Sequence, residues 1–344
     1  MFRKRRRGWC HRGVGTSPSR FSANVLPALT RSPQAKTTAA RDHYRRPCVS
    51  VTPVSRRYDT ISFLSDYGTR DEFAGVVRSV IRDIAPHAHV IDLTHEIAPF
   101  DVRAGALALA RSIAYVPEGV VLAVVDPGVG SARRPIAIEV AGGAGIFVGP
   151  DNGLLAPAVA IAGGAERAVE LSNADYRLEG ASTTFDGRDI FGPAAAYLCN
   201  GVDLTELGPE IDPALLMPSA VPLPRHEDDH VIAEVLWVDR FGNCQLNVGP
   251  EDLPAAWGST LSLELPDPVE IGARITRAAR RATTFSAIGG GIGLVLDSTG
   301  MLAVCIDRQS ASQELRIDVG DQVVLAQGSE PGETSITTPV ILGR

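Results

Sequence analysis

The chain has 344 residues, of which 44% are hydrophobic and 21% charged, and its formal net charge is −7. This length allows two domains with substantial cores, and the composition is ordinary for a globular protein. No apolar run approaches the roughly 18 residues of a membrane-spanning helix, so we expect no membrane partner. The five cysteines form no CxxC pair and have no histidine at metal-ligand spacing. This argues against a disulfide framework and a metal site, and fits a reducing cytoplasm.

Residues 1–58 differ from the rest of the chain in charge. They hold 14 of the 33 Lys and Arg residues and only one acidic residue, Asp42. They lack periodic apolar spacing, so they are predicted to be disordered. Three interpretations compete: a nucleic-acid or membrane arm, a transit-like peptide, or a start of translation placed too early. The last is favoured, with the true start near Val51, because the globular pattern begins abruptly at Thr60.

Alternating apolar runs then predict a regular order of elements. They are a strand at 61–64, a helix at 71–84, a strand at 89–92, a helix at 101–114 and a strand at 120–125. The charges of Asp71 and Glu72 favour the beginning of the first helix. The β-α-β-α-β order predicts a parallel sheet covered by helices.

The second half of the chain changes character after residue 209. Before it, strands are expected at 135–140 and 145–148, and helices after the turn 149–155 and at 190–199, with Asp189 either capping the last helix or stabilising it by its charge. After it, short β runs are predicted at 231–238, 244–248, 260–265, 292–296, 301–306 and 322–326, with Gly289–Gly293 as a flexible turn.

These patterns predict an α/β fold with a smaller antiparallel β domain. The α/β domain is assigned to residues 59–212 and the β-rich domain to residues 230–330. Between them, prolines and acidic residues mark a linker at 213–229, and residues 331–344 are a tail. Because the folded body is acidic, nucleic acid is disfavoured as its partner.

The segment Asp126–Arg134 is the strongest candidate for a site. It follows the buried strand at 120–125, and Pro127 and two glycines turn the backbone before Arg133. In open α/β sheets, ligands bind at the edge where parallel strands end. The alternative interpretation is a plain turn with surface arginines.

Six separated motifs occur in one order and carry a resemblance to a known family. They are Ser65-Asp66-Tyr67-Gly68 with Asp71, Asp92-Leu93-Thr94-His95, Asp126-Pro127-Gly128-Val129-Gly130 with Arg133, Pro150-Asp151-Asn152-Gly153, Phe185-Asp186-Gly187-Arg188-Asp189, and Asp239-Arg240-Phe241-Gly242-Asn243. Over residues 60–330 the chain resembles the S-adenosyl-L-methionine (SAM) hydroxide adenosyltransferases, or SAM hydrolases. This family is related to the fluorinating and chlorinating SAM enzymes.

The resemblance implies that SAM and water give adenosine and L-methionine. It also implies a homotrimer with active sites between subunits, and no metal or separate cofactor, since SAM is the substrate. Asp126 and Arg133 match two members of the family's Asp–Arg–His set. The third position, usually histidine, is Asp186 here, which creates a different general base or slows the reaction. His95 is a less favoured substitute for the missing imidazole.

The resemblance also implies the residues that bind the substrate. Asp66 matches the carboxylate that grips the ribose hydroxyls, and Asp71 a residue near the nucleoside. The others are Asp239 at the methionine ammonium, Asn243 at adenine, Phe185 and Phe241 on adenosine or in the core, Ser298 at the methionine carboxylate, and Ile306, Asp307 and Arg308 at the adenine edge. Thr299 departs from the arginine that follows this serine in the halogenases.

Three alternatives to hydrolysis stay open. The first is a catalytically weak protein of the same fold that binds SAM or adenosine, because the histidine is missing. The second is a SAM-dependent halogenase. It is less favoured because the halogenases have an uncharged residue at the position of Asp126, whose charge would repel a halide. The third is a nucleic-acid-associated protein acting through residues 1–58.

Overall fold

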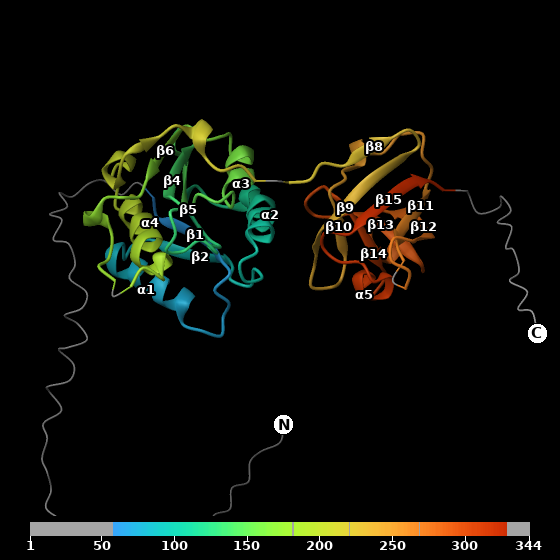
Figure 1. Ribbon diagram of the computed structural model, residues 1–344, viewed down its shortest axis with the longest axis horizontal. Helices are drawn as coiled ribbons and strands as arrows, with labels where there is room; N and C mark the ends of the chain where they lie inside the picture. The colour runs from blue at the N-terminus through green and yellow to red at the C-terminus, as the bar shows by residue number, and fades with distance from the viewer. Residues whose placement is uncertain (1–57, 181, 220, 268, 329–344) are drawn as a thin grey trace, which may run out of the picture. The chain divides into compact units, whose positions relative to one another are not determined.

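The computed structural model describes residues 58–180, 182–219, 221–267 and 269–328. They form an α/β region followed along the chain by a β region, coloured blue to yellow and yellow to red in Figure 1. The expectations for residues 1–57 and for the tail at 331–344 lie outside the described residues. Among the described residues, no helix has the length and apolar character needed to cross a membrane.

A seven-stranded mixed sheet, in the order β2-β1-β3-β5-β4-β6-β7, forms the centre of the α/β region. Its strands are β1 (Thr60–Ser65), β2 (His89–Thr94), β3 (Gly119–Val124), β4 (Pro135–Val140), β5 (Gly145–Pro150), β6 (Arg167–Glu170) and β7 (Glu210–Ile211). The predicted parallel sheet is confirmed for β2, β1, β3 and β5, whereas β4, whose direction was not predicted, pairs antiparallel with β5. Only residues 141–144 join β4 to β5, and so short a connection permits a hairpin but no parallel crossover.

Helices cover both faces of this sheet. They are α1 (Phe73–Ile84), α2 (Val102–Ser112), α3 (Ala156–Ile161) and α4 (Gly192–Cys199). Phe63 packs in a core with residues of α1 and α4, while its neighbour Leu64 packs in a second core with residues of α2 and α3. Because adjacent strand residues point to opposite faces, each helix pair covers one face. The two helix layers leave the edge of the sheet uncovered, and the turns that follow the strands lie there.

The segment before α4 differs from the prediction. The expected helix 190–199 is preceded by a π-helical turn at Gly187–Phe191, and α4 begins only at Gly192. Asp189 caps no helix. It is buried, and its two carboxylate oxygens accept hydrogen bonds from Arg188 Nε and Nη2 at 2.6 and 2.7 Å. A helix cap precedes the first helical residue, whereas Asp189 lies within the π-helical turn.

The β region closes into a mixed barrel, in the order β10-β14-β13-β12-β11-β15-β9-β8, because β10 also pairs with β9. Its elements are β8 (Arg225–Glu227), β9 (His230–Val238), β10 (Cys244–Leu246), β11 (Thr260–Pro266), β12 (Arg274–Ala282), β13 (Ile292–Leu296), β14 (Leu302–Ile306), α5 (Ala311–Leu315) and β15 (Gln322–Gln327). The pairing is antiparallel as predicted, except that β12 and β13 run parallel. β8 falls in the segment predicted as a linker, yet it pairs with β9.

Candidate active site

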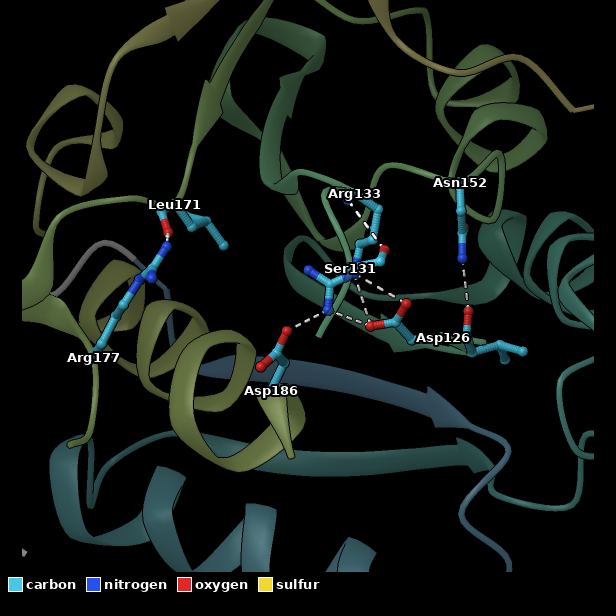
Figure 2. Close-up of polar contacts among 8 residues, drawn as sticks. Asp126, Ser131, Arg133, Asn152, Leu171, Arg177 and Asp186 are labelled. Atoms are coloured by element: carbon cyan, nitrogen blue, oxygen red, sulfur yellow. Dashed lines mark hydrogen bonds and ion pairs between the residues drawn. The ribbon is translucent and has the colours of Figure 1, made fainter. Parts of the chain in front are cut away.

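The site begins where two neighbouring parallel strands end. Ser65, the last residue of β1, is paired with Val124, the last residue of β3. The next polar residues along the two strands, Asp66 and Asp126, therefore leave the sheet at the same edge. The backbone is fixed there by a hydrogen bond from Asn152 Nδ2 to the carbonyl oxygen of Val125 at 2.9 Å (Figure 2).

A tight turn after β3 brings Arg133 back to Asp126. The Val129 N–H donates to the Asp126 carbonyl oxygen at 3.3 Å, and Gly130 has φ +76°, a conformation that glycine adopts without strain. Arg133 Nε then lies 3.0 Å from Asp126 Oδ1 and 2.9 Å from Oδ2. The turn is therefore more than a connection, because it presents a carboxylate and a guanidinium as one bonded unit.

Asp186 completes this unit from a distant part of the chain. Arg133 Nη2 donates both to Asp126 Oδ2 and to Asp186 Oδ2, as Figure 2 shows. The three side chains are only 6%, 11% and 13% exposed in the order Asp126, Arg133 and Asp186. One guanidinium thus holds two largely buried carboxylates, and we call these three residues the Asp–Arg–Asp cluster.

The electrostatics of the cluster keep Arg133 charged. Burial lowers the pKa of the Arg133 guanidinium, but the hydrogen bonds and charges of Asp126 and Asp186 outweigh it, so that the pKa is raised. A second cation lies nearby. Burial lowers the pKa of Arg177, and the charge of Asp186 partly offsets this. Figure 2 shows that the Arg177 side chain reaches the carbonyl oxygen of Leu171 and not the cluster.

Aromatic rings lie next to the cluster. The ring of Phe191 lies 5.1 Å from the Arg133 guanidinium. Phe185 packs edge-on against Phe73 and Tyr67, with ring centroids 5.1 and 5.6 Å apart. Phe185 is thus part of the core packing of the α/β region, and only its remaining exposed surface is open to a ligand. Low polarity around the charges strengthens every electrostatic interaction within the site.

Asp66 is held by a residue that sequence reasoning missed. Its Oδ2 accepts a hydrogen bond from the Phe100 N–H at 2.9 Å. Phe100 has φ +70°, a strained conformation for a residue other than glycine, and its side chain is 69% exposed. Proline and aspartate around Phe100 mark a turn before α2, but no sequence pattern indicates the sign of its φ angle.

Asp71 and His95 belong to a separate hollow. Asp71 lines a cavity of about 410 Å³ together with Glu72, Arg78, Asp92 and His95. His95 is 6% exposed, and its Nδ1 and Nε2 lie 2.7 Å from Ser65 Oγ and 3.0 Å from Asp92 Oδ1. Both ring nitrogens are engaged, so His95 braces β1 against β2 and does not replace the missing imidazole.

In the β region, three of the predicted binding residues share one cavity of about 220 Å³. They are Asp239, Asn243 and Ser298. Asp239 Oδ1 accepts from the N–H groups of Phe241 and Asn243 at 2.8 and 2.9 Å, and its Oδ2 accepts from Asn243 Nδ2 at 2.8 Å. This short hairpin leaves Phe241 77% exposed and outside the core.

The remaining predicted residues lie elsewhere in the β region. Ile306 ends β14, and Asp307 and Arg308 follow it, so none of them lines this cavity. Arg308 has φ +56° and is 89% exposed. Thr299, beside Ser298, donates to Asp297 Oδ1 at 2.7 Å and accepts from Gln245 Nε2 at 2.8 Å.

Comparison with known proteins identifies the family. A model of the SAM hydroxide adenosyltransferase N-terminal domain matches residues 61–208, and a model of its C-terminal domain matches residues 233–324. The chain belongs to the SAM hydroxide adenosyltransferase family. A relative from Salinispora tropica named (R)-S-adenosyl-L-methionine hydrolase is 45% identical over 270 residues, which cover 78% of this chain and 98% of that protein.

Two other proteins show how similar the chain is to a solved structure and to a halogenating enzyme. The crystal structure of an uncharacterized conserved protein from Thermotoga maritima has a TM-score of 0.70 and 32% identity, covering 77% of this chain and 99% of that one. A protein named fluorinase from Actinoplanes is 28% identical over 220 residues, covering 57% of this chain and 74% of its own. This SAM hydroxide adenosyltransferase is therefore more similar to the proteins named hydrolases than to a halogenase.

Proposed function

We propose that this chain hydrolyses SAM to adenosine and L-methionine. The observation that carries the proposal is the Asp–Arg–Asp cluster at the carboxyl ends of the parallel strands. Two carboxylates held by one guanidinium form a rigid, acceptor-rich surface that can hold a water molecule. Rigid placement of the nucleophile is the main requirement when the leaving group is already activated.

The reaction needs little more than this placement. The sulfonium makes methionine a good leaving group, so water attacks the ribose C5′ in line with the C5′–S bond. The new C5′–O bond forms as the C5′–S bond breaks, and that electron pair remains on sulfur as the methionine thioether. One proton of the water passes to a carboxylate, which acts as a general base.

The two carboxylates are unequal, and this assigns their roles. Asp126 is bound by Arg133 through both oxygens, whereas Asp186 shares only Oδ2 with Arg133. Among the described residues, Asp186 Oδ1 accepts no hydrogen bond. We therefore assign proton transfer to Asp186, in the position of the family's histidine, and orientation of the water and of Arg133 to Asp126.

The proposed contacts to the substrate follow the family resemblance. Asp66 binds the ribose hydroxyls, and its bond from the Phe100 N–H orients the carboxylate for this. Asp239 and Asn243 meet the methionine ammonium and the adenine, with Ser298 at the methionine carboxylate, and their shared cavity supports this grouping. Asp71, Ile306, Asp307 and Arg308 are assigned to the nucleoside on the resemblance alone.

We also propose a homotrimer with active sites between subunits, and a cytoplasmic location. The exposed Phe241 ring supports the first, because an apolar ring beside a binding residue is suited to cover by substrate or by a second subunit. The cysteines Cys199, Cys244 and Cys305 are free and buried, which supports a reducing compartment. Light scattering of the full chain at several concentrations tests the trimer.

Isotope labelling tests the function directly. The full chain is incubated with SAM in H₂¹⁸O containing chloride and fluoride, and the products are identified by mass spectrometry. We expect adenosine with ¹⁸O at C5′ and unlabelled methionine. A 5′-halo-5′-deoxyadenosine product would instead identify a halogenase, and tight binding of SAM without turnover would identify a binding protein.

A further inference from the structure

A tyrosine that no assigned role uses lies beside Phe185 and Gly187, the two chain neighbours of Asp186. Tyr67 follows Asp66 directly after β1, and its ring packs edge-on against Phe185, next to Asp186 in the chain. Its phenol pKa is raised by burial and by the charges of Asp66, Asp126 and Asp186, and lowered in part by Arg133. The phenol therefore stays protonated and keeps its O–H as a hydrogen-bond donor.

The backbone of the catalytic segment is shaped around this hydroxyl. A Cβ atom on Gly187 would lie 2.1 Å from Tyr67 Oη and 3.0 Å from Tyr67 Cζ, far inside van der Waals contact. Any larger residue after Asp186 would therefore meet the phenol. Among the described residues, the hydroxyl makes no hydrogen bond, although the side chain is only partly exposed.

We propose that the Tyr67 hydroxyl donates a hydrogen bond to the attacking water, and that Tyr67 and Asp186 together do the work of the family's histidine. This inference rests on the proposed hydrolysis. An imidazole can donate or accept, whereas an ionised carboxylate can only accept. Replacing histidine by Asp186 thus removes a donor from the site, and Tyr67 supplies one.

The hydrogen-bonding capacity of the water supports this division of roles. A water molecule has two protons and two lone pairs. Asp126 and Asp186 accept hydrogen bonds from its two O–H groups, and the Tyr67 hydroxyl donates to one lone pair, so that the second lone pair is left for C5′. The Nε and Nη2 groups of Arg133 already donate to the two carboxylates, so these donors are not free for the water. The Tyr67 proton is not transferred.

The test is a pair of substitutions measured in two backgrounds. Tyr67→Phe keeps the ring that packs against Phe185 and removes only the hydroxyl. We expect kcat for SAM to fall about tenfold or more with KM within about twofold, because the lost bond acts on the water and not on the substrate. In an Asp186→His background, where the imidazole can donate, we expect Tyr67→Phe to lower kcat by less than about twofold.

Tyr176→Phe is the matched control. It also removes a phenol hydroxyl from a buried ring, but that hydroxyl donates to Glu206 Oε2 at 2.6 Å, so we expect kcat to be unchanged. Equal kcat for Tyr67→Phe and the unsubstituted chain would overturn the inference. An equal loss of kcat in both backgrounds would also overturn it, since it would indicate a structural role for Tyr67. Inactivity of Asp186→His would overturn it as well. If the unsubstituted chain releases no adenosine, the proposed function itself fails.

Discussion

The Asp–Arg–Asp cluster of the α/β region and the Asp239 hairpin of the β region bind their carboxylates in opposite ways. In the cluster, Arg133 joins Asp126, seven residues away, to Asp186, 53 residues away, and all three side chains are largely buried. In the hairpin, every hydrogen bond to Asp239 from the described part of the chain comes from within four residues, and the neighbouring Phe241 is 77% exposed.

On the proposed function, this difference separates the residues of the chemical step from those that bind the substrate. Buried charges need partners in fixed positions, so the cluster is rigid and depends on the whole fold of the α/β region. The hairpin depends on a local turn, so its side chains can change with little effect on the fold. Substitutions in the cluster should therefore alter stability and kcat, and substitutions in the hairpin should alter mainly KM.

The largest effect is expected for Arg133→Ala. It leaves Asp126 and Asp186 buried without their shared cation, and breaking a buried ion pair in this way costs about 3–5 kcal/mol of unfolding free energy. Turnover of SAM should be lost as well. Denaturant unfolding measures the first and adenosine release the second. Arg280→Ala, on the exposed side of β12, is the control and should change neither.

Gly187→Ala is expected to be the next most severe. The added methyl group meets Tyr67, and overpacking of this kind costs about 1–3 kcal/mol. In a Tyr67→Phe background the cost should shrink, because the closest atom is then absent. Gly75→Ala in α1 is the control, since its Cβ would meet no atom within 4 Å and should leave stability unchanged or raise it. An equal cost at both glycines would contradict the contact with Tyr67.

The same contrast, between local and long-range contacts, determines how much of the structure could be predicted from the sequence. Buried strands such as 120–125 and the turn after them are local patterns, and the structure has them where they were expected. The direction of β4, the π-helical turn before α4 and the Arg-rich strand β12 were not predicted, because pairing and packing with distant segments override local preference there. The bond from Phe100 to Asp66 and the contact of Gly187 with Tyr67 are likewise long-range and leave no pattern in the sequence.

Asp239→Asn should affect recognition with little effect on the fold. The new amide oxygen can still accept from the backbone of Phe241 and Asn243, and the Asn243 amide can rotate to accept from the new NH₂ group. We expect the free energy of unfolding to change by less than about 1 kcal/mol. The KM for SAM should rise about tenfold, because the carboxylate that we propose meets the ammonium is lost. A fall in kcat with unchanged KM would instead place Asp239 in the chemical step.

Phe241→Ala is expected to have the smallest effect, and it separates the two possible covers for this ring. The ring is 77% exposed, so unfolding free energy should change by less than about 0.5 kcal/mol. If Phe241 packs on adenosine, KM should rise about threefold to tenfold while the oligomeric state is unchanged. If it packs on a second subunit, light scattering should show dissociation at concentrations where the unsubstituted chain stays assembled. Destabilisation of several kcal/mol would contradict both, because it would mean that Phe241 belongs to the core.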